Sequence, residues 1–481
     1  MPERPAVLVV AWQGFATRYL LRTDIARRIA EHAQLVVLAP NAGEAYLRDE
    51  VAALGGVVEP LAVSSDLFSS SRARWLAHHL RTHTLAHGAE SRALRERWDR
   101  FHADVAGQSR PLAALLQALV PGLWRWSRLR RGLLAAERRA FADDPHAAVW
   151  ERHRPAAVLV GSLGYRFADA VVMREAHRRG VPVIAAVAAW DNPTSKGYKA
   201  GDPEIAAVWS QRMADQVARF QDVPRHRLLV SGAAAFDHLR RPGALEPRTE
   251  HVRSRGLDPD RKLVLFAASS PGTYAHNLDV ARALAEAVTA GALGPPASLV
   301  VRLHPNYAKA SYDEGLEAWR ALAGAHEHVM LDVPPVVSRA MVADLAPSDM
   351  VAFGSLMAAS DVVVNVFSTT TLEAFLLDRP VVLVSQTAHL PAPAADATAT
   401  QERRWDAYAH QLGVIEAGAV RVAGSSAELL EHVRAYLADP SLERAERARV
   451  VDTELGPADG RAGDRIADAV LRVLDRQART A

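Results

Sequence analysis

The chain has 481 residues, enough for two to four domains, and its 49% hydrophobic and 23% charged residues are typical of a globular protein. It contains no cysteine, which excludes disulfides, zinc–thiolate sites, iron–sulfur clusters and thiol nucleophiles. No apolar run approaches the ~20 residues that span a bilayer, and the amino terminus lacks the apolar core of a signal peptide. We therefore expect a soluble, cytoplasmic protein of enzyme size.

The net charge of +2 conceals an uneven distribution. Between Arg72 and Arg139 the chain carries fourteen arginines, no lysine and five acidic residues, a net charge of +9. The rest of the chain is mildly acidic, so one segment alone is strongly basic.

The first 240 residues predict alternating strands and helices interrupted by one helical segment. Short apolar runs predict strands at Val7–Ala11, Leu35–Leu38, Val57–Val63, Ala157–Val160, Val181–Ala188, Ala206–Trp209 and Leu228–Ser231. Apolar spacing predicts helices at Thr17–Glu31 and Phe167–Arg179. The basic segment, about residues 66–150, is rich in Arg, His and Trp and predicts a helical insertion.

A stretch rich in proline, glycine and charge between Arg240 and Arg261 marks the expected domain boundary. Beyond it, strands are predicted at Leu263–Ala267, Leu299–Leu303, Val329–Leu331, Val362–Val366 and Val381–Val384, and a last helix at Arg461–Gln477. Strands that alternate with helices indicate parallel sheets covered on both faces. We expect an α/β protein with two Rossmann-like domains facing a cleft, residues 1–245 and 246–460, followed by a C-terminal helix in 461–481.

Small and polar residues follow three predicted strands of the second domain. Ser368, Thr369 and Thr370 form a strand-to-helix turn, where hydroxyls and free helix N–H groups can hold an anion. Glu373, one turn further on, is placed to accept hydrogen bonds from ribose hydroxyls. The alternative is a capping box between Thr370 and Glu373.

His304 ends another strand, and strand carboxyl ends in such sheets face the ligand crevice. A structural histidine is the alternative. Ser269, Ser270 and Gly272 follow the domain's first strand, and their small size permits a ligand to approach the backbone. An ordinary turn has the same composition.

The first domain carries one further polar cluster, directly after the strand at Val181–Ala188. Asp191 is a candidate general base for an acceptor hydroxyl, and Lys196 is a candidate anion contact. Asn192 and Ser195 are candidate acceptor contacts, as is Gly14 in the first strand-to-helix loop. An Asx-type turn explains the Asp191–Pro193 sequence equally well.

Several of these motifs together resemble the C-terminal domain of GT-B-fold transferases. They are Ser269–Gly272, Leu303-His304-Pro305, the block from Ser360 to Ala374, and Arg379-Pro380-Val381. The closest likeness is to the branch that contains CDP-glycerol glycerophosphotransferase-like proteins and related surface-glycan glycosyltransferases. It covers roughly residues 161 to the end and includes Val230–Asp237, Asp459-Gly460-Arg461 and Arg465-Ile466.

The resemblance implies that Ser368, Thr369 and Thr370 contact a diphosphate, that Glu373 contacts the ribose, and that His304 lies beside the donor phosphates or leaving group. In such folds the final helix returns to the N-terminal domain, and many members need no metal or other cofactor. The only Asp-x-Asp motif, Asp258-Pro259-Asp260, lies in the predicted linker and predicts a turn.

The sequence departs from two relatives of that fold. Ser385–Leu390 replaces the Thr-Glu-Arg-Pro-like stretch of UDP-sugar 2-epimerases, which disfavours an epimerase. Asn365–Ser368 replaces the Asp-Tyr-Ser-Ser of polyol-phosphate transferases, which favours a sugar donor.

The basic segment has three interpretations. Trp124 and Trp126 alternate with Arg125, Arg128, Arg130 and Arg131, a pattern that suits an anionic membrane surface. Binding of nucleic-acid phosphates is the second interpretation, and a solvated helical insertion is the third. We expect no nucleic-acid partner, because no known module is present and the rest of the chain is acidic.

The sequence thus predicts a glycosyltransferase that moves a sugar from a nucleotide donor to a hydroxyl of a cell-surface or lipid-linked glycan, in the cytoplasm or at the inner face of the membrane. The alternatives are a CDP-glycerol-type glycerophosphotransferase, an isomerase of the UDP-sugar 2-epimerase kind, and a non-enzymatic binding protein.

Overall fold

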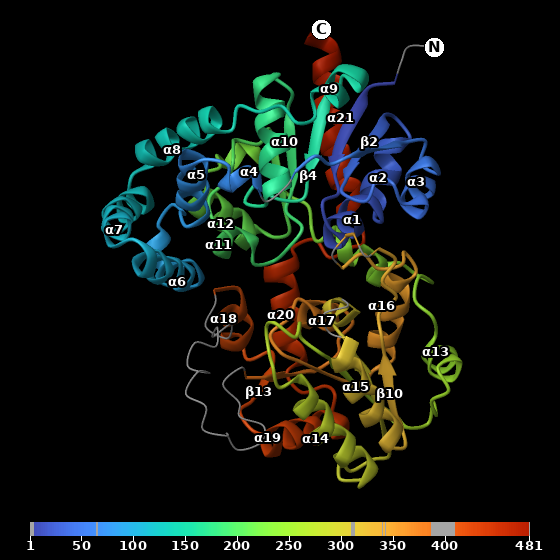
Figure 1. The fold of residues 1–481 in the computed structure, drawn as a ribbon. Helices are drawn as coiled ribbons and strands as arrows, with labels where there is room; N and C mark the ends of the chain where they lie inside the picture. The colour runs from blue at the N-terminus through green and yellow to red at the C-terminus, as the bar shows by residue number, and fades with distance from the viewer. Residues whose placement is uncertain are drawn as a thin grey trace. The chain divides into compact units, whose positions relative to one another are not determined.

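The computed structural model describes residues 4–63, 66–308, 313–338, 340–341, 343–385 and 409–480. The chain divides into two compact units. Figure 1 shows the fold with a colour that runs from blue at the N-terminus to red at the C-terminus. Unit 1 comprises Met1–Ala235 and Arg461–Ala481, and unit 2 comprises Phe236–Gly460. The division precedes the expected boundary at 245 because Leu239 and Leu245 both pack against Gly354 of unit 2.

Unit 1 contains a parallel sheet of seven strands in the order β3-β2-β1-β4-β5-β6-β7. The strands are β1 (Ala6–Val10), β2 (Gln34–Ala39), β3 (Val57–Pro60), β4 (Ala157–Val160), β5 (Val183–Ala186), β6 (Ile205–Val208) and β7 (Leu228–Val230). They match the seven predicted strands, although β3 and β5 are shorter than expected. Because most of their residues are apolar and buried, helices cover both faces of this sheet.

The helix predicted at Thr17–Glu31 is two helices, α1 (Gly14–Leu21) and α2 (Asp24–Ala30). The chain breaks at Thr23, whose extended backbone and side-chain hydroxyl cap a new helix start by accepting the Ile25 N–H.

The remaining helices around this sheet are α3 (Ala45–Ala52), α10 (Phe167–Arg178), α11 (Asn192–Ser195), α12 (Gln211–Gln221) and α21 (Ala462–Thr480). The last helix, α21, packs against α2 within unit 1. Gly463 permits this close approach, since a Cβ there would lie 3.2 Å from the Cβ of Asp24. An ion pair between Arg28 and Asp468, 2.7 Å, also joins the two helices.

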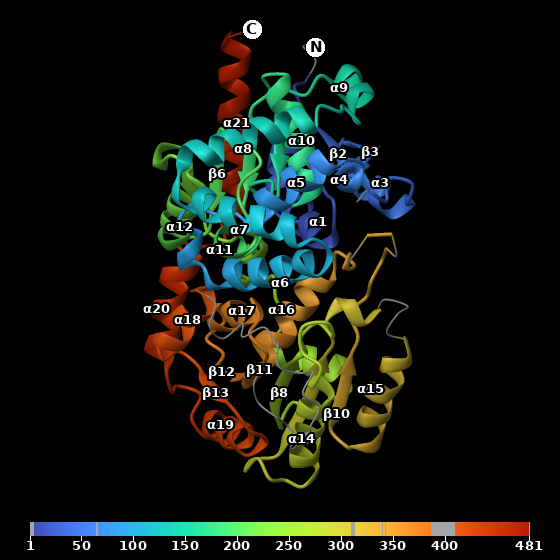
Figure 2. The same cartoon turned by 60° about the vertical axis from the view of Figure 1, so that its left-hand side comes forward.

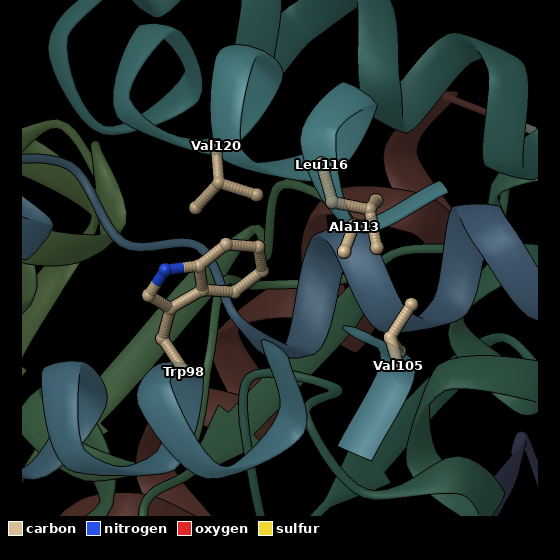
Figure 3. Packing of buried hydrophobic residues seen from close by; sticks show 5 residues of the cluster. All are labelled: Trp98, Val105, Ala113, Leu116 and Val120. Atoms are coloured by element: carbon tan, nitrogen blue, oxygen red, sulfur yellow. The ribbon is translucent and has the colours of Figure 1, made fainter. Parts of the chain in front are cut away.

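The predicted helical insertion lies between β3 and β4. It consists of α4 (Asp66–Ser69), α5 (Arg72–Thr82), α6 (Arg92–Gln108), α7 (Arg110–Arg125), α8 (Ser127–Ala140) and α9 (Ala147–His153), with a short 3-10 helix at Gly88–Glu90. Figure 2 shows α5 to α8 gathered together on unit 1. Helices α6 and α7 have a core of their own, drawn in Figure 3, formed by Trp98, Val105, Ala113, Leu116 and Val120.

A buried arginine joins the insertion to the sheet. The Nε of Arg81 donates to the carboxylate of Glu137 at 2.7 Å, which links α5 to α8. Its Nη1 donates to the carbonyls of Gly164 and Tyr198, in the segments that follow β4 and β5. Arg174 of α10 lies 3.2 Å from the same Glu137 carboxylate. Arg81 and Glu137 are 0% and 1% exposed, so this network lies inside unit 1.

Unit 2 contains a parallel sheet of six strands in the order β10-β9-β8-β11-β12-β13. The strands are β8 (Lys262–Ala267), β9 (Ala297–Arg302), β10 (Val329–Asp332), β11 (Val362–Asn365), β12 (Val381–Val384) and β13 (Arg421–Ala423). The helices are α13 (Arg248–Ser254), α14 (Asn277–Thr289), α15 (Asp313–Ala325), α16 (Asp349–Ala359), α17 (Thr370–Leu376), α18 (Ala409–Glu416), α19 (Ser426–Ala438) and α20 (Arg444–Leu455). Only β13 was not predicted, because its sequence Arg-Val-Ala lacks an apolar run, unlike the equally short Leu-Leu-Val of β7.

The turn predicted at Asp258–Asp260 is present, because the backbone N–H of Asp260 donates to the side chain of Asp258 at 2.9 Å. In the described part of the chain, no helix combines the length and apolarity needed to cross a bilayer.

Removing the charge of Glu137 should strongly destabilise unit 1. The Glu137→Gln variant leaves Arg81 and Arg174 buried without a counter-charge, and breaking a buried pair in this way costs about 3–5 kcal/mol. Glu90→Gln is the matched control, because Glu90 pairs with Arg219 at the surface, where such pairs contribute at most about 1 kcal/mol. Denaturant unfolding measures both. Equal stability of the two variants would contradict a structural role for the network.

Two histidines at the end of α5, His79 and the C-cap His83, pack against α6, while His78 packs against Phe68 and Phe167. The rings of His79 and His83 stack on Phe101 at 4.6 and 4.3 Å between centroids. Burial lowers the pKa of His79 to about 4 and that of His83 to about 3, and nearby Arg97 acts in the same direction. Burial likewise lowers the pKa of His78 to about 2. These side chains are therefore neutral in the folded protein near pH 7.

Acidification should destabilise the fold through this cluster. Between the unfolded pKa of 6.5 and the lowered folded values, the unfolded chain binds more protons, so the free energy of unfolding falls as the pH falls. His83 alone should account for about 2 kcal/mol between pH 7.5 and pH 5. The His83→Gln variant should lose that part of the pH dependence, whereas His226→Gln, at an exposed position, should keep it. Unfolding curves at the two pH values measure this, and an unchanged pH dependence in His83→Gln would refute it.

Candidate functional site

The strand order of unit 2 reverses between β8 and β11, which are neighbours in the sheet. At such a switch point the loops after the two strands run in opposite directions and leave a crevice at their carboxyl ends, where ligands of open α/β sheets bind. The register pairs Ala267 of β8 with Arg302 of β9 and with Asn365 of β11. The loops that follow these three strands therefore leave the same edge of the sheet, and together with the start of α17 they contain all the predicted donor-site residues.

The loop after β8 is closed by a buried asparagine. The Asn277 side chain accepts the Ser269 N–H at 2.9 Å and donates to the carbonyls of Ser269 and Tyr274. Ser269 and Ser270 are partly exposed, and Gly272 is exposed with open space where a Cβ would stand. The loop is thus fixed at its base while the predicted contacts remain accessible.

The loop after β9 places His304 beside the first loop. The backbone N–H of Asn306 donates to His304 Nδ1 at 3.1 Å, so the proton of the neutral ring lies on Nε2. The Asn306 side chain donates to the hydroxyl of Ser270 at 2.9 Å. His304 is only partly buried, as expected for a crevice residue. Asn306 was not among the predicted site residues, although its place directly after His304-Pro305 was a usable signal.

The turn after β11 is not capped by the Thr370–Glu373 capping box that the sequence offered as an alternative. The hydroxyl of Ser368 accepts the Thr370 N–H at 3.3 Å and donates to the Thr370 hydroxyl at 3.1 Å. Thr370 is the first residue of α17, and the Glu373 N–H bonds to the carbonyl of Thr369. The capping box of Thr370 and Glu373 is therefore not formed. Ser368, Thr369 and Thr370 are all partly exposed.

Two residues that the sequence analysis did not single out support this turn. The buried Asn365 donates to the hydroxyl of Thr371 at 3.1 Å, which ties the end of β11 to the start of α17. Phe367 adopts φ +43°, an uncommon conformation for a bulky residue. Glu373 is 6% exposed, so its carboxylate lies mostly within unit 2. Of the epimerase-distinguishing stretch, Ser385 is buried at the end of β12, and residues 386–390 lie outside the described residues.

Unit 1 has a switch point of the same kind between β1 and β4. The guanidinium of Arg166, in the segment after β4, lies 5.2 Å from the ring centroid of Trp12, in the loop after β1. Gly14 is buried at the start of α1 in this region. The structure therefore places Gly14 close to the carboxyl ends of β1 and β4. Its role as an acceptor contact stays a prediction.

A buried acid lies next to this switch point. The Ser162 hydroxyl donates to the carboxylate of Asp169, and the Gly164 N–H donates to the Ser162 hydroxyl at 3.1 Å. Burial raises the pKa of Asp169 to about 7. The sequence signal was Gly161-Ser162 directly after a strand.

The residues predicted to contact the acceptor after β5, from Asp191 to Lys196, form the one-turn helix α11 and the residue on either side of it. Lys196 Nζ lies 2.7 Å from the carboxylate of Asp191, and the Ser195 hydroxyl donates to the same carboxylate at 3.0 Å. Asn192 and Ser195 are buried, and Arg97 of the insertion donates to the Ser195 carbonyl. The turn interpretation is compatible with these contacts. The roles of Asp191 as a base and of Lys196 as an anion contact stay predictions, and each requires the ion pair to open.

No cluster of three or more potential metal-ligating side chains occurs within the described ranges.

The sequence matches no known family model, and no curated protein matches it either. Solved structures do resemble it. Staphylococcus aureus MnaA in complex with UDP has a TM-score of 0.55 at 11% identity, over 98% of this chain and 97% of that one. UDP-GlcNAc 2-epimerase from Neisseria meningitidis, bound to UDP-GlcNAc, has a TM-score of 0.51 at 11% identity, over 97% and 100%. A glycosyltransferase from Rickettsia africae has a TM-score of 0.50 at 8% identity, over 99% and 100%.

These proteins share two parallel α/β domains with this chain over nearly its whole length. The fold is of the GT-B type. At such low identity the GT-B likeness establishes the architecture alone, and the CDP-glycerol branch suggested by the sequence motifs is not shown by these comparisons.

His304 can be tested without disturbing its loop. In the His304→Asn variant the side-chain oxygen can still accept the Asn306 N–H, while the Nε2–H donor is lost. If that donor stabilises a leaving group, turnover should fall roughly 10²–10³-fold with little change in melting temperature. Steady-state kinetics and thermal unfolding on one preparation measure both. Unchanged turnover would show that Nε2 has no part in the reaction.

Proposed function

We propose that this protein is a GT-B glycosyltransferase that moves a sugar from a nucleoside-diphosphate donor to a hydroxyl of a cell-surface or lipid-linked glycan. The observation that carries this proposal is the edge of the second sheet, where the loops after β8, β9 and β11 begin side by side. There Ser270 and His304 are joined through Asn306. The proposal is supported by neighbours of the same fold that were solved with UDP or UDP-GlcNAc bound.

In this proposal the leaving diphosphate lies against the hydroxyls of Ser368, Thr369 and Thr370, and Glu373 accepts hydrogen bonds from the ribose. The Nε2–H of His304 donates to the leaving group. The departing nucleoside diphosphate gains negative charge in the transition state, and donors already fixed in place stabilise that charge. No metal or other cofactor is assigned to the reaction.

Proton removal from the acceptor hydroxyl is assigned to unit 1. Asp191 is the base proposed from the sequence, and its carboxylate must first leave Lys196. A general base is most effective when its pKa lies near the pH at which the enzyme works.

A second candidate is an isomerase of the UDP-sugar 2-epimerase kind, because the neighbour from Neisseria meningitidis carries that name and was solved with UDP-GlcNAc bound. The motif expected of such an epimerase is missing after Val384. A glycerophosphotransferase with a CDP-glycerol donor is the third candidate.

Product analysis separates the three reactions. Thermal-shift measurements with UDP, GDP, CDP, dTDP and CMP first identify the base, since a ligand at about 100 times its Kd stabilises the fold by about 3 kcal/mol. The matching donors are then incubated with and without glycan acceptors. Acceptor-dependent release of nucleoside diphosphate supports the transferase. Conversion of the donor sugar without an acceptor identifies the epimerase, and release of CMP identifies the glycerophosphotransferase.

Glu373→Gln tests the donor assignment separately from turnover. Loss of a charged acceptor for ribose hydroxyls should weaken nucleotide binding by about 1.5–3 kcal/mol. Glu428→Gln, which removes an exposed carboxylate of α19 that accepts the Gly424 N–H, is the control and should bind nucleotide normally. Isothermal titration gives both affinities. Parental affinity in Glu373→Gln would place the ribose elsewhere.

A further inference from the structure

The exposed apolar side chains of unit 1 gather on the outer part of the insertion. Five large hydrophobic residues are exposed in the described part of unit 1, and all but Phe15 lie on α7, on α8 or between them. They are Leu115, Leu119, Trp126 and Leu129, which are 41–56% exposed. Isolated exposed hydrophobic residues are ordinary, but a group of four within fifteen positions indicates an interaction surface.

These side chains form a continuous stripe. Leu115, Leu119 and Gly122 are spaced i, i+4 and i+7, which places them on one face of α7. Leu129 of α8 covers Gly122, since a Cβ on Gly122 would lie 3.2 Å from Leu129 Cδ1. The stripe therefore runs from α7 onto α8.

The stripe is not part of the core of the insertion. The buried face of α7 is already occupied, because Ala113, Leu116 and Val120 pack against Trp98 and Val105 of α6 (Figure 3). The exposed stripe is thus a second apolar surface on the same helix.

The segment that carries the stripe has only positive charges up to the buried Glu137. No acidic residue occurs from Val105 to Ala136. The next one, Glu137, is buried with Arg81 and does not offset the surface charge. The exposed cations are Arg110, Arg125, Arg128 and Arg131. The Arg125 guanidinium lies 5.2 Å from the Trp126 ring centroid, so the exposed tryptophan has a cation beside it.

Two residues of the sequence-based membrane hypothesis do not belong to this surface. Trp124 donates from Nε1 to the His83 carbonyl at 2.9 Å and packs against Gly88. Arg130 is buried and donates to Asp222 at 2.8 Å. Both serve the inside of unit 1, so the apolar contacts come from leucines that the Trp–Arg pattern did not reveal.

We propose that Leu115, Leu119, Trp126 and Leu129, with Arg110, Arg125, Arg128 and Arg131, form a docking face that binds the surface of an anionic phospholipid bilayer. Leucine and tryptophan enter the interfacial region while arginines contact lipid phosphates. A second copy of the chain fits less well, because a symmetric contact would bring arginine against arginine. The phosphates of a nucleic acid would pair with the arginines but would leave the leucine side chains exposed to water, so nucleic acid also fits this face less well.

Vesicle sedimentation tests the proposal and requires no turnover, so its outcome is independent of the proposed transferase activity. With vesicles of phosphatidylcholine containing about one third phosphatidylglycerol, we expect binding at least tenfold stronger than with phosphatidylcholine alone. Raising the salt concentration should weaken it. No binding to the anionic vesicles at low salt would overturn the proposal.

Serine substitutions at Leu119, Trp126 and Leu129 test the apolar part. This triple variant should bind anionic vesicles at least tenfold more weakly, with only a small change in melting temperature because none of the three side chains is buried. The matched control carries Val333→Ser, Val337→Ser and Val351→Ser, at exposed apolar positions of unit 2, and should bind like the parent. Parental binding by the first variant would overturn the proposal.

Glutamine substitutions at Arg125, Arg128 and Arg131 test the charge. Each arginine near an anionic surface contributes about fivefold to binding, which corresponds to about 1 kcal/mol. The control carries Arg95→Gln, Arg253→Gln and Arg479→Gln, which remove the same charge from exposed positions elsewhere. Equal loss in both variants would indicate net charge rather than a docking face. Two other outcomes would overturn the proposal if the parent protein does not bind vesicles. Polynucleotide binding that persists in the serine variant would assign this face to nucleic acid. A dimer of the parent protein that the serine substitutions abolish would assign the face to a second copy of the chain.

Discussion

The buried guanidinium of Arg81 is the interaction on which the first unit depends. It binds a carboxylate of α8 and two backbone carbonyls that follow β4 and β5. Those two segments contain the buried Ser162–Asp169 pair and the Asp191–Lys196 pair. The helical insertion is therefore not an appendage on a finished sheet. Its central arginine supplies donors to the loops that carry the candidate acceptor chemistry, and loops held in this way can keep polar side chains in fixed positions.

The two units apply one arrangement twice. In each sheet the first strand of the unit is the third in order, and the order reverses beside it. Such a reversal separates neighbouring loops at the carboxyl edge, so the same topology produces a ligand position in each unit. The units differ in what surrounds that position. Unit 2 fixes its loops with amide side chains such as Asn277 and Asn306, whereas unit 1 uses ion pairs and a buried acid.

Most of the architecture could be predicted from the sequence, because apolar runs of strand length are a direct consequence of a doubly covered parallel sheet. The errors have local causes. Thr23 divides a helix whose apolar spacing is otherwise continuous, and β13, Arg-Val-Ala, has no apolar run. The position of the donor loops followed from their place after strands. The hydrogen-bond partner of each side chain could not be predicted in the same way, since the Ser368 hydroxyl caps α17 in place of Thr370. The alternation of Trp and Arg near residue 124 also could not reveal that Trp124 faces inward.

The packing of α21 on α2 has a consequence for synthesis on the ribosome. Ile25 and Ile29 of α2 are fully buried, and so are Ile466 and Val470 of α21. The whole of unit 2 lies between these helices in sequence, so it emerges and has time to fold while the apolar face of α2 still lacks its cover. Unit 1 completes its core only when α21 has left the exit tunnel. Until then the nascent chain carries a nearly finished seven-stranded domain with one open side, a state that a chaperone can recognise.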